Sequence, residues 1–105
     1  MLWLGGQGLA ELDKDALPAV EEGFAINFFV KEPHIINPSS LCFDHKGRLY
    51  VGAGPQYRHP REDSPTDYIK ILIDENGDGI AETVKTFAEG LNCVQAMAWK
   101  GNELW

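Results

Sequence analysis

The sequence predicts an all-β fold of short antiparallel strands. Runs of β-branched residues, or of apolar residues alternating with polar ones, recur about every 10–15 residues, with Gly, Pro, Asp and Asn between them. Helical patterning is almost absent. With 105 residues, 44% of them hydrophobic and 10% aromatic, the chain has the length and composition of one small globular domain.

The first segment, residues 1–23, is expected to be a short irregular or helical leader. Residues 10–17 fit one or two helical turns, which Pro18 would end. Alternating apolar residues then predict a strand over 24–30. The strands expected after it are 39–43, 49–52, 68–73, 83–87 and 94–99, with a further one starting at 104–105.

The segments between these strands differ in kind. Residues 44–47 form a tight turn, with Gly47 at the position that favours a positive φ. Residues 54–67 form a long polar loop containing three prolines, and residues 74–82 form an acidic loop. Long loops in compact folds are often functional, although an inert surface excursion is the simpler interpretation.

A weak internal repeat suggests how the strands are organised. Residues 37–43 align with residues 92–98, 55 positions later, and residues 47–50 with residues 102–105. A period near 50 residues is typical of a propeller blade of four short strands, although coincidence in a strand-rich chain is an alternative. We therefore expect a partial β-propeller over 24–105. Residues 24–31 would be the ring-closing strand, 37–88 the first blade, and 92–105 the start of the second blade of a longer protein.

The acidic loop resembles the first nine positions of an EF-hand calcium loop. Oxygen-bearing side chains alternate along it and a glycine follows, which suits a hard cation. The expected ligands are Asp74, Asn76, Asp78, the backbone carbonyl of Ile80, and Glu82. An EF-hand would need a Glu three residues later, where Lys85 stands, so a structural calcium site and a plain polar turn are both left open.

Charge and hydropathy exclude some functions. A net charge of −7 disfavours binding to nucleic acid, whose phosphates require Lys and Arg. No apolar run approaches the roughly 18 residues of a membrane span, so we expect no membrane insertion. The N-terminus shows no signal-peptide pattern.

Several segments, in order, resemble one known family. These segments are residues 17–24, 29–33, 37–38, 43–51, 71–82 and 86–91. Together they resemble the opening of the putative membrane-bound dehydrogenases of planctomycetes and verrucomicrobia, which are similar to the soluble quinoprotein glucose/sorbosone dehydrogenases.

The resemblance implies a six-bladed propeller, pyrroloquinoline quinone (PQQ) as a cofactor, and a location in the periplasm or cell envelope. It also implies downstream helical-repeat and cytochrome c domains. Neither Cys42 nor Cys93 begins a C-x-x-C-H motif, so this segment should bind no haem through that motif. Whether the two cysteines form a disulfide or stay free is left open.

Blade topology assigns the connections to two ends of the sheet. Residues 44–47 and 74–82 should share one end, and residues 54–67 and 89–93 the other, where propellers commonly bind ligands. We therefore expect Gln56, Arg58, His59 and Gln95 to bind a cofactor or substrate. The alternatives are that Arg58 and His59 are simply solvated, and that the Gln95 side chain only satisfies a buried backbone group. No catalytic residue is recognised.

Three functions follow as hypotheses. The first is part of a quinoprotein-like dehydrogenase that oxidises a sugar or alcohol, inactive without its remaining blades. The second is a non-catalytic propeller that binds carbohydrate or protein and has a structural calcium loop. The third, a self-contained calcium module, is disfavoured because a single blade buries too little apolar surface.

Overall fold

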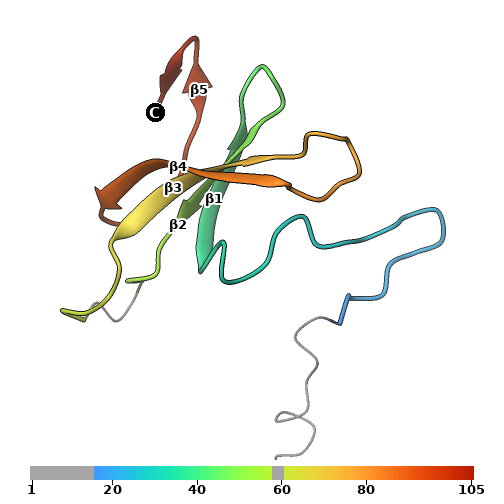
Figure 1. The fold of residues 1–105 in the computed structure, drawn as a ribbon, viewed down its shortest axis with the longest axis horizontal. Coiled ribbons are helices and arrows are strands. Elements are labelled where there is room, and N and C mark those ends of the chain that lie inside the picture. Colours follow the sequence, from blue (N-terminus) through green and yellow to red (C-terminus); the bar gives the residue numbers. More distant parts are fainter. Residues whose placement is uncertain (1–15, 58–60) are drawn as a thin grey trace, which may run out of the picture.

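The computed structural model describes residues 16–57 and 61–105, and within them it is all-β (Figure 1). Its main sheet has four antiparallel strands in sequence order: β1 (Pro38–Phe43), β2 (Leu49–Ala53), β3 (Asp67–Ile73) and β4 (Thr83–Leu91). A two-stranded hairpin of β5 (Trp99–Lys100) and β6 (Glu103–Leu104) follows. The described residues contain no helix, and hence none long and apolar enough to cross a membrane.

The first four predicted strands of the sheet are confirmed, because β-branched and apolar residues alternate along them. The register pairs Leu41 with Val51 and Leu49 with Leu72. β4 is longer than predicted and continues to Leu91, where it pairs with Asp67. The helical turns considered for residues 10–17 fall almost wholly outside the described residues, and residues 16–23 are irregular.

The strand predicted over residues 94–99 is wrong for most of its length. Only Trp99 lies in β5, and one further backbone pair joins Ala98 to Trp105. Within the described residues, residues 94–97 pair with no strand, and Val94 lies against the main sheet at Gly52. Apolar composition favours a strand, but a strand also requires a neighbour with which to exchange hydrogen bonds.

Residues 24–31 also form no ladder with any described residue. They make one backbone contact with the main sheet's loops, from the Ala81 N–H to the Phe29 carbonyl at 2.9 Å. The sequence predicts that they pair with a strand of another blade. Their ring-closing role therefore stays a prediction.

The two faces of the sheet are covered differently. On one face, Ile35, Val51 and Leu72 form the buried core, and Phe29 and Val84 pack against it. On the other face, Tyr50 makes edge-to-face ring contacts with Phe87 and with Trp99 of the hairpin, at centroid distances of 5.2 and 5.0 Å. Tyr50 and Val51 are adjacent in β2, so their side chains point to opposite faces.

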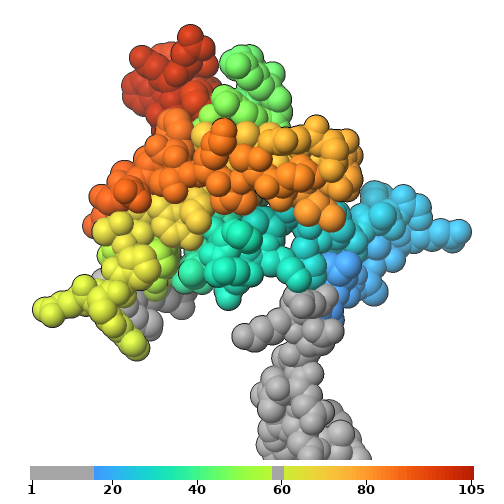
Figure 2. All heavy atoms as spheres, viewed as in Figure 1, coloured from blue at the N-terminus to red at the C-terminus, as the bar shows by residue number. Residues whose placement is uncertain are grey.

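Part of the apolar surface is uncovered. On β1, at the edge of the sheet, Leu41 and Phe43 are 62% and 65% exposed. The space-filling view shows the 24–36 segment, coloured blue to cyan, lying beside the acidic loop, and the red hairpin at the top of the view next to the green 44–47 turn (Figure 2).

Candidate functional site

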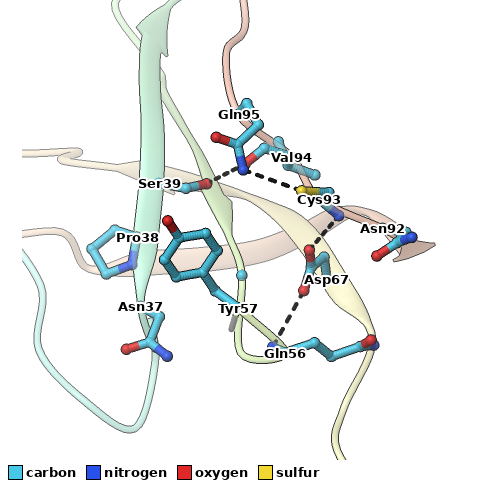
Figure 3. Close-up of a pocket in the computed structure, with 11 residues that line it drawn as sticks. Asn37, Pro38, Ser39, Gln56, Tyr57, Asp67, Asn92, Cys93, Val94 and Gln95 are labelled. Atoms are coloured by element: carbon cyan, nitrogen blue, oxygen red, sulfur yellow. Dashed lines mark hydrogen bonds between the residues drawn. The ribbon is translucent and has the colours of Figure 1, made fainter. Parts of the chain in front are cut away.

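A pocket of about 770 Å³ lies at the end of the sheet where β2 leaves and β3 begins. The 92–95 connection, which follows β4, closes one side, and the residues just before and at the start of β1 close another (Figure 3). The residues that line it are Asn37, Pro38, Ser39, Gly54, Gln56, Tyr57, Asp67, Asn92, Cys93, Val94 and Gln95. Two loops that the sequence assigned to one end of a blade thus meet around one cavity.

Asp67 holds these two loops together. It is the first residue of β3 and is only 3% exposed. Its Oδ2 accepts a hydrogen bond from the backbone N–H of Cys93 at 2.6 Å, and its Oδ1 accepts one from Gln56 at 3.5 Å. A buried carboxylate needs such donors to offset the loss of water.

The backbone at the pocket is held in unusual conformations. Cys93 and Asn37 have φ angles of 61° and 50°, in the left-handed region that most residues avoid. The Ser39 hydroxyl lies 2.6 Å from the Val94 carbonyl oxygen, and the Gln95 amide donates to the Cys93 sulfur at 3.2 Å. Such conformations persist only where the surrounding contacts fix them, and they are frequent at binding sites.

Two of the four predicted binding residues line the same pocket. Gln56 and Gln95 both line the pocket, from the two different loops. Arg58 and His59 lie outside the described residues. Sequence reasoning missed Asp67, whose only signal was a lone acidic residue directly before a predicted strand. It also missed Asn37 and Asn92, which were noticed only as repeat positions.

The described lining suits uncharged polar ligands. Its one charged side chain is Asp67, and its other polar groups include the amides of Asn37, Gln56, Asn92 and Gln95. PQQ carries carboxylates, which proteins usually pair with Arg or Lys. No described lining residue supplies such a cation, so these residues do not fit the quinone, which stays a prediction from the family resemblance.

The acidic loop lies at the other end of the sheet, between β3 and β4. Oxygen atoms of Asp74, Asp78 and Glu82 come within 4.8 Å of one another. The Asp74 carboxylate accepts backbone N–H bonds from Gly79 at 2.8 Å and Gly77 at 2.7 Å. The hydrogen bond from the Gly79 N–H, with those from neighbouring amides, lowers the pKa of Asp74. Partial burial acts in the opposite direction but is outweighed.

The other two predicted ligands have different contacts. The Asn76 amide nitrogen donates to Glu82 Oε1 at 2.6 Å, while its oxygen accepts the Asp78 N–H at 2.8 Å. The Ile80 N–H donates to Asp78 Oδ1 at 2.9 Å. The three carboxylates could hold a hard cation, whereas the Asn76 oxygen, the atom that would coordinate it, accepts the Asp78 N–H.

The acidic loop also contacts the segment before the sheet. The Asn27 side-chain amide donates to the Gly79 carbonyl at 2.8 Å, close to the bond between Phe29 and Ala81. Gly79 has a φ of 84°, a conformation that glycine adopts without strain. The shape of this loop and the position of residues 27–29 are thus linked.

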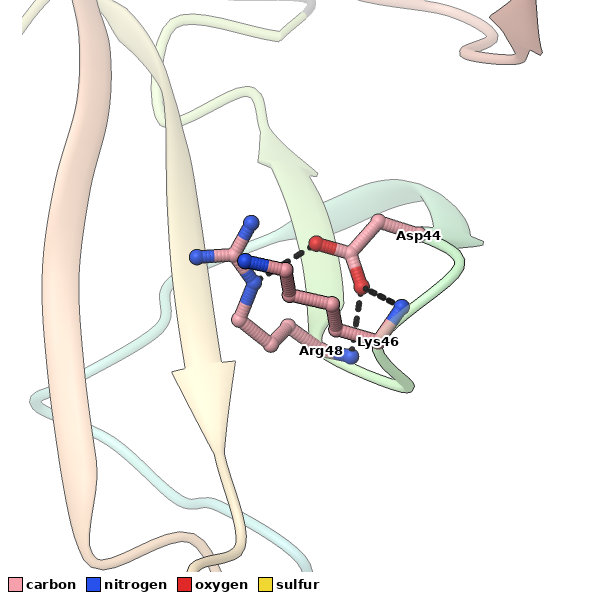
Figure 4. A network of polar contacts seen from close by, with 3 residues as sticks. All are labelled: Asp44, Lys46 and Arg48. Atoms are coloured by element: carbon pink, nitrogen blue, oxygen red, sulfur yellow. Dashed lines mark hydrogen bonds and ion pairs between the residues drawn. The ribbon is translucent and has the colours of Figure 1, made fainter. Parts of the chain in front are cut away.

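The turn between β1 and β2 has a polar network of its own (Figure 4). The Asp44 carboxylate accepts the N–H groups of Lys46 and Arg48, both at 2.9 Å, and the Arg48 Nε–H at 2.6 Å. Burial opposes ionisation of Asp44, but these bonds outweigh it and lower its pKa. The network closes the turn on itself and has a structural role.

Comparison with known proteins identifies one family. A family model described as a domain of unknown function, DUF7133, matches residues 15–103. No curated protein and no solved structure matches the chain.

Proposed function

Taking as the premise that the chain belongs to DUF7133, a domain of unknown function, we propose that it forms one wall of a ligand-binding mouth in a propeller-type dehydrogenase that oxidises a sugar or alcohol. The observation that carries this proposal is the pocket, which Gln56 and Gln95 line from two separate loops. Amide side chains both donate and accept hydrogen bonds, as recognition of a hydroxyl group requires.

The propeller interpretation is supported by the order of the strands and by their uncovered surface. Four antiparallel strands in sequence order are the unit from which propeller blades are built. Leu41 and Phe43 expose large apolar side chains that a neighbouring blade would bury. We therefore propose the remaining blades and downstream domains of a longer protein as the partners. The proposed location, the periplasm or cell envelope, rests on the family resemblance.

This chain would carry out only part of the proposed reaction, and the rest would belong to other blades or domains of a longer protein. Oxidation of a hydroxyl carbon needs a hydride acceptor and a base, and we assign neither to the described residues of this chain. The described residues of this chain orient the ligand through amides and one carboxylate. We therefore expect this chain to bind ligand but to reduce no artificial electron acceptor when sugar and quinone are added.

Titration of methyl β-D-glucoside, followed by calorimetry and by NMR of the amide groups, tests the ligand-binding role. Gln95→Ala should weaken binding about fivefold, since one lost hydrogen bond at a binding site is worth around 1 kcal/mol. Asn102→Ala removes an exposed amide from the β5–β6 turn and serves as the matched control. Equal affinities for wild type and Gln95→Ala would reject the site.

A second candidate function, a non-catalytic propeller with a structural calcium loop, is favoured by the three carboxylates of the acidic loop. Calcium would hold residues 74–82 in shape and, through Asn27, the segment before the sheet. Calorimetric titration of calcium should release heat with the wild type and little with Asp78→Ala. Asp63→Asn, at an exposed site in another loop, should behave as the wild type. Equal heats from wild type and Asp78→Ala would exclude the site.

A further inference from the structure

The pocket contains a buried carboxylate that pairs with no cation among the described residues. We propose that Asp67 makes this pocket selective for neutral polyols over their anionic counterparts, such as sugar acids. The inference rests on the proposed sugar-binding role and specifies its substrate class. It concerns a residue that the sequence did not single out.

The hydrogen bonds of Asp67 leave acceptor capacity for a ligand. An ionised carboxylate offers about four lone-pair sites, and the described residues occupy two of them. Oδ2 is well bonded to the Cys93 N–H at 2.6 Å, but the contact of Oδ1 with the Gln56 N–H, at 3.5 Å, is at the limit of a hydrogen bond. In the close-up, this carboxylate lies between the two loops that form the mouth (Figure 3). A ligand hydroxyl can therefore donate to Oδ1.

The electrostatic setting decides which ligands the pocket accepts. Asp67 is almost fully shielded from water, so a charge placed near it is screened much less than at the surface. A ligand carboxylate would meet a like charge with no described cation in the lining to offset it. A hydroxyl in the same place would instead gain a charge-assisted hydrogen bond.

The rest of the lining fits the same ligand class. Amides of Gln56 and Gln95 can each donate to one hydroxyl and accept from the next, as adjacent hydroxyls on a sugar ring require. Tyr57 also lines the cavity and is 59% exposed. Aromatic side chains together with a few polar groups are typical of pockets for small molecules.

A matched pair of ligands tests the inference. Methyl β-D-glucoside and methyl β-D-glucuronoside have the same ring and differ in one carboxylate. Titrated into the wild-type chain near neutral pH, the glucuronoside should bind about tenfold more weakly or worse, a conservative figure for like charges in a poorly screened site. Equal or tighter binding of the glucuronoside would overturn the inference, and this comparison requires no variant.

Two variants separate the charge of Asp67 from its structural role. Asp67→Asn keeps an oxygen for the Cys93 N–H and should bring the two affinities to within about threefold of each other, because the repulsion is removed. Asp63→Asn, which removes the same charge from an exposed position in the same loop, should leave the preference unchanged. An unchanged preference in a folded Asp67→Asn chain would show that Asp67 only supports the loops, and would overturn the inference.

The outcomes also distinguish the inference from the proposed function. If neither glycoside binds the wild type, the sugar-binding role fails and the inference fails with it. If both bind equally well, the sugar-binding role survives and only the selectivity is wrong. Should Asp67→Asn not fold, Asp67→Glu keeps the charge and should retain the wild-type preference; loss of the preference in that folded variant would also count against the inference.

Discussion

Replacing Gly52 with Ala tests how closely the 92–95 connection lies on the sheet. A Cβ atom at this position would come within 2.5 Å of Ser40 Oγ and 2.6 Å of Val94 Cγ1, about 1 Å closer than ordinary carbon contacts. The backbone of Gly52 lies outside the left-handed region, so the substitution meets only a lack of space. The Ser40 hydroxyl can turn away, but the β-branched Val94 side chain has few alternative rotamers.

The magnitude follows from two opposing effects. Overpacking a well-filled site destabilises the folded state by about 1–3 kcal/mol. Alanine also restricts the unfolded chain, which stabilises the protein by about 0.4–1 kcal/mol. We therefore expect a net loss of roughly 1–2 kcal/mol. Because Val94 must move, the pocket should also deform and bind the glucoside more weakly.

Urea unfolding followed by tryptophan fluorescence measures the change in the free energy of unfolding. Gly54→Ala is the matched control, because a Cβ atom there would meet its nearest neighbours at an ordinary 3.7 Å. Adding Val94→Ala should restore much of the stability lost in Gly52→Ala, since the clashing methyl groups are then gone. The reasoning is refuted if Gly52→Ala is as stable as Gly54→Ala, or if Val94→Ala rescues nothing.

Three further predictions concern stability, pH and thiol reactivity. Leu72→Ala should lower the free energy of unfolding by about 2–5 kcal/mol in a urea titration, because the side chain is fully buried in the core; a loss below about 1 kcal/mol would show a looser core. The folded state lowers the pKa values of Asp44 and Asp74. Both carboxylates therefore stabilise the fold at pH values above the ordinary carboxyl pKa, and this stabilisation is lost as the pH falls through their folded-state pKa values. Thermal unfolding from pH 7 downward should show this loss, and Asp74→Asn should reduce it; an identical pH profile would contradict the contribution of Asp74. Burial, together with Asp44, raises the pKa of the free Cys42 thiol, so Cys42 should react more slowly with iodoacetamide near neutral pH than the exposed Cys93, as peptide mass spectrometry can measure.

The strand pattern shows which part of the fold is encoded locally. Along β2 and β3, alternation of side chains and flanking turn residues indicate the strands. Their order in the sheet follows because strands that are consecutive in the sequence are usually neighbours, even across the long polar loop between these two. The Asp-rich loop is likewise visible in the sequence, since the contacts that its residues make with one another lie within nine residues. Residues 94–97 differ, because their composition suits a strand although no described strand pairs with them.

The sequence by itself determined the all-β class, four strands of the main sheet, the acidic loop, and the two loops that share an end of the sheet. Only the tertiary structure decided that Asp67 lies buried between those loops, that Val94 covers Gly52, and that residues 27–29 contact the acidic loop. The physical reason is the separation along the chain over which each effect acts. Alternation and turn chemistry act over a few residues, whereas the burial of a carboxylate depends on segments 26 residues apart in the chain that meet only when the sheet has formed.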